Sequence, residues 1–142
     1  MPDLATISLD LPATNRYLNV LSACIAEMLS RVEERPPQET QIYELQLAAQ
    51  EIGANIVDHA YPVNSDGRIC IQLIYNPAVR QYTIVFTDTG QPYQEQGAPM
   101  LPGVEESANG GMGMFLVFSL VDDLNYQRLN DTNVWQMTKR LD

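Results

Sequence analysis

The segment from about residue 38 to 60 has apolar residues at a helical period along its whole length, and this constrains the fold more than any other feature. The residues step by 3 and 4 along the chain: Ile42, Leu45, Ala49, Ile52 and Ile56. This spacing places them on one face of a helix. Pro62 ends the helix, because proline cannot continue one. A helix this long with one apolar face requires a second layer of structure to cover it.

Another helix is predicted ahead of this one, from about Pro12 to the Pro36-Pro37 pair. Proline is common in a first helical turn, and Thr14 and Asn15 are typical of helix starts. The apolar residues again step by 3 or 4: Leu18, Leu21, Ile25, Met28 and Val32. We expect this stripe to be part of the core.

Five further runs have the composition of β-strands. They are residues 4–9, 69–75, 81–87, 124–129 and 133–139. Turn-forming residues at 76–80 and 130–132 predict two antiparallel hairpins. A third helix over 114–122 is predicted after the glycines at 110–113.

The order of these elements predicts an α/β (α+β) two-layer sandwich, with the helices on one face of a mixed, mostly antiparallel sheet. The chain has 142 residues, of which 45% are hydrophobic and 18% are charged. This size and composition are typical of one globular unit, so we expect residues 1–142 to form a single domain.

The charge balance excludes some classes of function. Lys and Arg number 8 against 18 Asp and Glu, a net charge of −10 that is unsuited to direct nucleic-acid binding. No apolar run reaches the roughly 20 residues of a membrane span. The start Met1-Pro2-Asp3-Leu4 lacks the basic residues of a signal peptide, so we expect a cytoplasmic protein. Cys24 and Cys70 show no CxxC or Cys/His spacing and are expected to be reduced core residues.

A polar line runs along the helix predicted over 38–60. Glu51, Asn55 and His59 are four residues apart, so a carboxylate, a carboxamide and the only imidazole of the chain share one face. A carboxamide oxygen beside phosphate oxygens is a suitable ligand for Mg²⁺. The alternative is an ordinary solvated face, and His59 taken alone is more typical of a packed or capping histidine.

A glycine-rich region precedes the third predicted helix. Residues 89–109 hold six Gly and Pro residues and few aliphatic ones, and the length is typical of a lid, which we place at 91–110. The glycines at 110–113 offer backbone N–H groups at a helix start, where an anion is favoured. The alternative is a plain turn, because the spacing matches neither the Walker pattern nor the dinucleotide fingerprint.

Asp88-Thr89-Gly90 follows the predicted strand 81–87 and allows three interpretations. One is a turn in which Asp88 bonds its own backbone. Another is an aspartic-protease half-site, but the two long helices predicted before this motif do not fit the all-β fold of that family. In the third, Asp88 accepts a hydrogen bond from an exocyclic amino group and Gly90 lets the base approach the backbone.

Four segments follow one another in the chain: ELQLAAQEIGANIVDHAY (44–61), TDTGQPY (87–93), GGMGMFLV (110–117) and NVWQMTKR (133–140). In this order they resemble the bacterial anti-sigma-factor serine kinases, within the ATPase superfamily shared by gyrase and histidine kinases. The resemblance covers residues 4–141 and implies the Bergerat ATP-binding fold with ATP and Mg²⁺ as cofactors.

The resemblance also implies roles for individual residues. Asn55 matches the asparagine that binds Mg²⁺, and His59 matches a residue close to the nucleotide. Glu51 matches the acid that acts as general base. Asp88 matches the residue that reads the adenine amino group.

The remaining matches concern smaller residues. Gly90 matches the glycine beside the adenine-reading aspartate, and Gly111 and Gly113 match glycines of the lid and phosphate contact. Thr138, on the last strand, is our choice for the hydroxyl of the base pocket. Pro92 stands where many of these kinases have a second glycine, which leaves the phosphotransfer rate open.

The function implied is that of a serine/threonine kinase in partner switching. Such a protein binds a sigma factor and phosphorylates a serine of an anti-anti-sigma protein, and it can form a homodimer. The first helix shows no match to residues that grip a sigma factor. The alternative is a nucleotide-binding sequestering module without kinase activity. A histidine-kinase catalytic domain is disfavoured, because no phospho-acceptor helix pair is visible.

Overall fold

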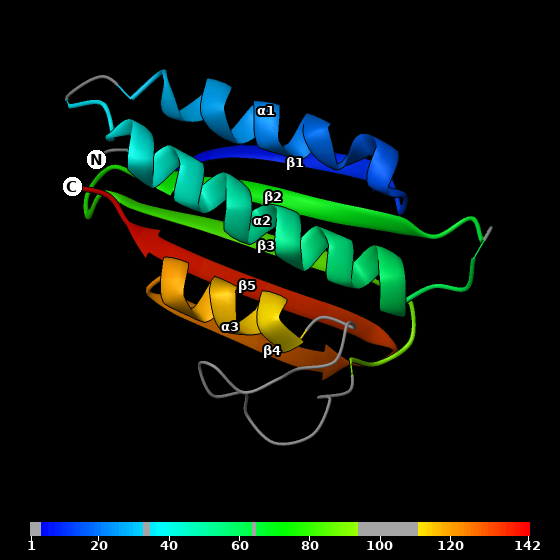
Figure 1. Cartoon of the computed structure of the whole chain (residues 1–142). Helices are drawn as coiled ribbons and strands as arrows, with labels where there is room; N and C mark the ends of the chain where they lie inside the picture. The colour runs from blue at the N-terminus through cyan, green and yellow to red at the C-terminus, as the bar shows by residue number, and fades with distance from the viewer. Residues whose placement is uncertain (1–3, 33–34, 64, 94–110) are drawn as a thin grey trace.

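The computed structural model describes residues 4–32, 35–63, 65–93 and 111–142, which form two layers (Figure 1). One layer is a sheet of five strands, and the other holds α-helices that all lie on the same face of it. The strands are β1 (Ala5–Pro12), β2 (Arg68–Asn76), β3 (Gln81–Asp88), β4 (Asp123–Leu129) and β5 (Thr132–Arg140). The helices are α1 (Leu18–Leu29), α2 (Glu39–His59) and α3 (Gly111–Leu120), with a 3-10 turn, η1 (Asn15–Tyr17).

The sheet has the strand order β1-β2-β3-β5-β4, and all four pairings between its described strands are antiparallel. The expected two-layer sandwich is therefore confirmed, as are both hairpins, β2–β3 and β4–β5. Because β5 lies between β3 and β4, the end of β3 meets the start of β5, and Asp88 is paired with Asn133. This order decides where the functional site forms.

The helix layer is centred on α2, which lies between α1 and α3 (Figure 1). The apolar face predicted for α2 is buried on the sheet, including Leu45, Ile52 and Ile56. Its bounds agree with the expectation to within one residue. The face at right angles, with Asn55 and His59, remains free to line a site.

The start of the first helix was predicted too early. Pro12 is the last residue of β1, where it pairs with Arg68, and α1 begins only at Leu18 after the turn η1. The helix ends at Leu29, so Val32 lies beyond it. Pairing with β2 extends β1 to Pro12, and this non-local contact overrides the local helix-start pattern.

The strands alternate between a buried face under the helices and an open face. On β3 the buried positions include Tyr82, Ile84 and Phe86, and Asp88 continues the same face. The prediction that both cysteines belong to the core is wrong for Cys70, which is free and exposed on the other face of β2. Among the helices described, none combines the length and the apolar character that crossing a bilayer requires.

Candidate functional site

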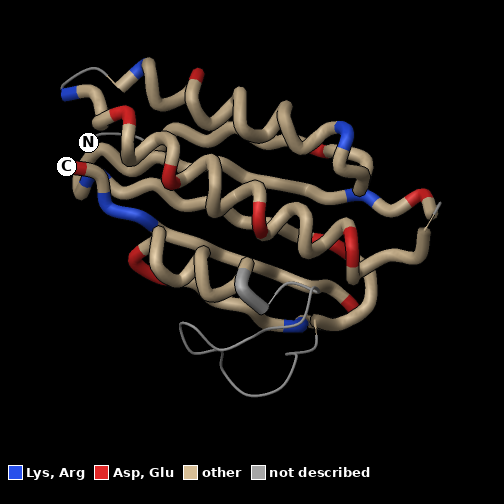
Figure 2. The backbone as a smooth tube through the Cα atoms, in the orientation of Figure 1, with Lys and Arg blue, Asp and Glu red and all other residues tan. Residues whose placement is uncertain are grey.

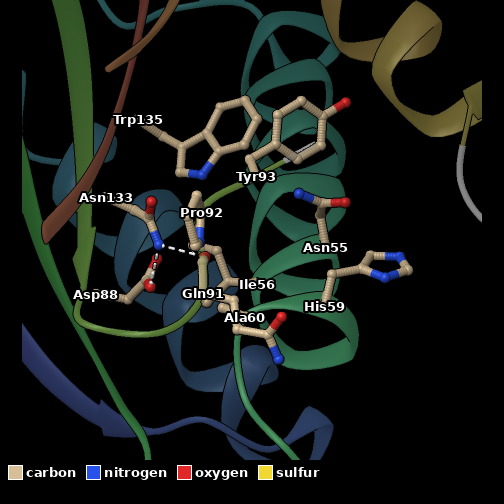
Figure 3. A pocket seen from close by; sticks show the side chains of 10 residues that line it. All are labelled: Asn55, Ile56, His59, Ala60, Asp88, Gln91, Pro92, Tyr93, Asn133 and Trp135. Carbon is tan, nitrogen blue, oxygen red and sulfur yellow. Dashed lines mark hydrogen bonds between the residues drawn. The ribbon is translucent and has the colours of Figure 1, made fainter. Parts of the chain in front are cut away.

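A pocket opens at the end of the sheet where β3 and β5 meet α2 (Figure 3). It has roughly 210 Å³ of space, including its mouth toward solvent. Its lining comes from α2, from the turn after β3 and from the start of β5: Asn55, Ile56, His59, Ala60, Asp88, Gln91, Pro92, Tyr93, Asn133 and Trp135. Three residues singled out from the sequence, Asn55, His59 and Asp88, are thus brought together.

Asp88 is the most deeply buried acid of the site. It is 3% exposed, and its Oδ1 accepts hydrogen bonds from Gly90 N (2.9 Å) and Asn133 Nδ2 (2.8 Å). Its Oδ2 is buried and has no hydrogen-bond partner among the described residues. A buried carboxylate oxygen without a donor is costly, so this atom is suited to accept a hydrogen bond from a ligand.

Gly90 is required by a close approach between two backbones. A Cβ at this position would lie 2.2 Å from the carbonyl oxygen of Ala60, at the end of α2. The next amide, Gln91 N, donates to the same oxygen at 2.7 Å. Glycine therefore lets the turn after β3 attach to the end of α2.

Asn133 is a site residue that sequence reasoning missed. It is 2% exposed, and its Nδ2 donates to Asp88 Oδ1 and to the carbonyl oxygen of Gln91, both at 2.8 Å. Figure 3 shows these two hydrogen bonds. A signal existed, because Asn133 continues the alternation of Trp135 and Met137, so a polar residue occupies a position of the buried face.

An aromatic cluster of Tyr93, Tyr126 and Trp135 borders the pocket and was also missed. The Tyr93 ring lies 4.8 Å from that of Trp135 and 5.5 Å from that of Tyr126, both in edge-on geometry. Tyr93 N donates to the Tyr126 hydroxyl (2.9 Å). These contacts seat the segment after Gly90 against β4 and β5, and Tyr93 and Trp135 contribute apolar ring surface to the pocket that Asp88 also lines.

The polar line of α2 divides between two neighbours. Asn55 and His59 both line the pocket from α2, on the side opposite to Asp88 and Asn133, and the exposed His59 ring extends outward from the helix (Figure 3). Glu51, one turn earlier, lies against α3 instead. Its Oε2 would be 2.6 Å from a Cβ on Gly113, so only glycine leaves the carboxylate this place.

Two further expectations concern the start of α3 and the segment before it. The third helix was predicted over 114–122, but α3 begins at Gly111 and ends at Leu120, so Gly111 and Gly113 belong to its first turn rather than to a turn before it. The lid expected at 91–110 lies outside the described residues from 94 onward.

Thr138 is not brought to the pocket. It pairs with Thr83 on β3, far along the strands from Asp88 and Asn133, and the two threonine hydroxyls are 3.5 Å apart. Its neighbours Met137 and Trp135 face the helices, so Thr138 belongs to the open face of the sheet. Thr138 therefore does not line this pocket.

The charge on α2 is entirely of one sign apart from His59. The helix contains Glu39, Glu44, Glu51 and Asp58 but no Lys or Arg, and Figure 2 shows it marked only by acidic positions. A cation is favoured beside such a helix, whereas a bare polyphosphate is repelled. An anionic ligand at this pocket would therefore bind best together with a divalent metal ion.

Comparison with known proteins identifies the class of domain to which this fold belongs. Residues 11–139 match the histidine kinase-like ATPase domain family, and the chain belongs to this family. The chain is 25% identical to the serine-protein kinase RsbW of Bacillus subtilis (strain 168) over 142 residues, covering 95% of this chain and 85% of that protein. It is 29% identical to RsbW of Oceanobacillus iheyensis over 126 residues, covering 83% and 76%.

Solved structures show the same fold. A crystal structure of RsbU and RsbW domains from Mycobacterium tuberculosis superimposes with a TM-score of 0.69 at 18% identity, covering 96% of this chain and 32% of that one. A blue-light activated histidine kinase of Erythrobacter litoralis superimposes with a TM-score of 0.60 at 16% identity, covering 92% and 42%. This chain thus corresponds to one part of those longer proteins.

Proposed function

We propose that this protein binds ATP with Mg²⁺ in the pocket at the end of α2 and is a serine kinase of the partner-switching type. The observation that carries the proposal is the buried, unpartnered Oδ2 of Asp88. The similarity to serine-protein kinases RsbW supports the kinase activity.

The base-reading role belongs to Asp88. Its Oδ1 is occupied by Gly90 N and Asn133 Nδ2, so Oδ2 is the oxygen left for a ligand. The exocyclic amino group of adenine is a donor of the right kind, and a purine ring is flat enough to lie beside Trp135.

The metal role belongs to Asn55. Its carboxamide lines the pocket on the side away from Asp88, which is where the phosphates would extend from a base held by Asp88. Mg²⁺ supplies charge neutralisation of the phosphates when bound. The acidic character of α2 favours the metal, and His59 lies one turn further along, close to the nucleotide.

The general-base role belongs to Glu51. It lies one helical turn before Asn55, so its carboxylate is within reach of a hydroxyl that approaches the γ-phosphate. Gly113 keeps space for this carboxylate at the start of α3, and Gly111 would add backbone N–H groups near the phosphates.

The proposed partners follow from the same resemblance to anti-sigma-factor kinases. The kinase would hold a sigma factor and phosphorylate a serine of an anti-anti-sigma protein, acting in the cytoplasm as a single domain that can form a homodimer. A second candidate function is a sequestering module in which ATP strengthens partner binding without phosphotransfer. Pro92 favours it, because this stiff residue lines the pocket where many of these kinases have glycine.

Nucleotide binding is tested by calorimetry with two variants. Asp88→Asn replaces an acceptor by a donor beside the adenine amino group, and Asn55→Ala removes the metal ligand. We expect each to weaken Mg²⁺·ATP binding by ~1.5–3 kcal/mol, roughly 10- to 150-fold in affinity. Unchanged affinity in both variants would mean that the nucleotide does not bind here.

Phosphotransfer is tested with labelled ATP and a candidate anti-anti-sigma protein. Glu51→Gln keeps the shape of the side chain and removes the base, so it should retain ATP affinity and lose ~10²–10⁴ in phosphotransfer rate. Glu39→Gln, the same change at an exposed position of α2, is the matched control. No transfer by the wild type, with ATP still tightening partner binding, would favour the sequestering module.

A further inference from the structure

Arg128, on β4, does not line the pocket, but it contacts residues around it. It is paired across the strands with Asn133, and its guanidinium Nη1 donates to Asn133 Oδ1 (3.1 Å) and to the carbonyl oxygen of Gly90 (2.7 Å). The side chain is 29% exposed, so these hydrogen bonds are partly shielded from water. Arg128 therefore touches Asn133, which in turn touches Asp88.

These contacts decide which way round the Asn133 amide stands. Its Oδ1 accepts from Arg128 and from the Tyr126 hydroxyl, and its Nδ2 is thereby turned toward Asp88. A reversed amide would point its NH₂ group at the guanidinium and its oxygen at the carboxylate, which places donor against donor and acceptor against acceptor. Arg128 and Tyr126 together exclude that arrangement.

The orientation of Asn133 determines which oxygen of Asp88 remains available. Because Asn133 Nδ2 and Gly90 N both donate to Oδ1, the carboxylate is held with Oδ2 free. Asp88 itself makes no ion pair with Lys or Arg in the described part of the chain. The Asn133 amide lies between Arg128 and Asp88, so its dipole transmits the favourable electrostatic effect of the guanidinium to the buried carboxylate.

We infer that Arg128 is a positioning residue for base recognition, which orients Asp88 through Asn133 and so sets the selectivity for adenine. The inference rests on the proposed nucleotide binding. A fixed Oδ2 accepts from an amino group and repels a carbonyl oxygen at the same place. A carboxylate released from this network can rotate, so it discriminates less between an amino group and a carbonyl oxygen on the base.

The test compares ATP with inosine triphosphate, which has a carbonyl oxygen in place of the adenine amino group. Trp135, the only tryptophan of the chain, lines the pocket, so its fluorescence reports binding of either nucleotide with Mg²⁺. The variant is Arg128→Met, and Arg140→Met removes the same charge from an exposed site on the neighbouring strand β5 as the matched control. Thermal unfolding without nucleotide checks that each variant is folded.

We expect Arg128→Met to reduce the preference for ATP over inosine triphosphate about 5- to 20-fold, and Arg140→Met to leave it unchanged. In an Asp88→Asn background, Arg128→Met should change ATP affinity less than about twofold, because its effect is transmitted by that carboxylate. A residue that only supports the turn after β3 would weaken ATP binding equally in both backgrounds.

Three outcomes would overturn the inference. An unchanged nucleotide preference in Arg128→Met, or effects that add in the double variant, would overturn it while ATP binding by the wild type stands. Wild-type protein that binds neither nucleotide would overturn the proposed function and the inference with it. Should Arg128→Met not fold, Tyr126→Phe removes the other donor to Asn133 Oδ1 and is expected to lower the preference in the same direction.

Discussion

At the scale of single residues, Gly90 and Gly113 both lie where a methyl group would meet another atom, but those atoms differ in how far they can move. At Gly90 the neighbour is the backbone oxygen of Ala60, 2.2 Å from an added Cβ. At Gly113 it is Oε2 of Glu51, 2.6 Å away at the end of a flexible side chain. The first glycine is needed for the backbone contact, and the second leaves room for the carboxylate of Glu51, the residue proposed as general base.

The two alanine variants should therefore differ in kind. Gly90→Ala is expected to lower the free energy of unfolding by about 1–3 kcal/mol, because a backbone must shift. Gly113→Ala should leave stability unchanged or raise it by up to about 1 kcal/mol, since alanine favours the helix. It should nevertheless slow phosphotransfer by displacing Glu51. Urea unfolding and the kinase assay measure both, and a Gly90→Ala protein as stable as wild type would contradict the contact.

The buried phenol of Tyr82 is expected to make the folded protein less stable at alkaline pH. It is fully buried on β3, and burial, followed by the effect of the Cys24 thiol, raises the pKa of Tyr82 well above the usual value of 10.0. In the unfolded chain the phenol ionises near pH 10, while the folded protein keeps the proton. The contribution of Tyr82 to the free energy of unfolding is therefore fully present below pH 10 and is lost as the pH rises toward the pKa of the folded state.

Tyr82→Phe should remove this loss of stability above pH 10. Between pH 9 and about pH 11 we expect the variant to lose about 1 kcal/mol less stability than wild type. Tyr43→Phe, which removes a phenol that is 62% exposed, is the control and should follow the wild-type curve. Urea unfolding at each pH measures the difference, and identical pH profiles for wild type and Tyr82→Phe would refute the effect.

At the scale of elements, α3 is held to the rest of the fold by a lysine from β5. Lys139 Nζ donates to the carbonyl oxygen of Leu120, the last residue of α3, at 2.7 Å and pairs with Glu44 of α2 at 3.2 Å. Its side chain is 13% exposed, so the contacts are largely shielded from water. One side chain thus joins β5, α2 and α3, and it fixes the helix whose start faces Glu51.

Lys139→Met should loosen this helix. We expect the free energy of unfolding to fall by about 1–3 kcal/mol, because the helix-end carbonyl and Glu44 both lose their partner. Amide exchange over 113–120 should become faster than in wild type. Arg140→Met, at the exposed neighbouring position, is the control. Equal exchange in the two variants would show that Lys139 does not hold α3.

At the scale of the whole molecule, like charges oppose folding. The net charge of −10 is spread over a chain of 142 residues, and Figure 2 shows acidic positions on both layers. Self-repulsion of this kind destabilises a compact state and is reduced by salt.

Stability should therefore rise with ionic strength. Between about 0.05 and 0.5 M NaCl we expect a gain on the order of 1 kcal/mol, or about 3 °C in Tm. KCl at equal ionic strength is the control and should act equally, because the effect depends on screening. Thermal unfolding measures it, and a Tm that falls or stays constant with either salt would contradict it.

Local spacing in the sequence was enough to identify the helices and strands, though not every boundary, and three of the residues that line the pocket. The 3-and-4 periodicity located α2 to within one residue, and turn residues located both hairpins. The same period aligned Glu51, Asn55 and His59, because residues four apart on a helix share a face whatever surrounds them. The charge balance and the family resemblance likewise required no coordinates.

Strand order and register were decided only by the tertiary structure. Asp88 and Asn133 are 45 residues apart, and they meet because β5 lies between β3 and β4. Thr138 is on the same strand β5, yet an odd step from Asn133 turns it to the open face. Pairing with β2 likewise extended β1 over residues with a local helix-start pattern. A polar residue becomes part of a site through neighbours that are distant in sequence, and periodicity within one element carries no information about them.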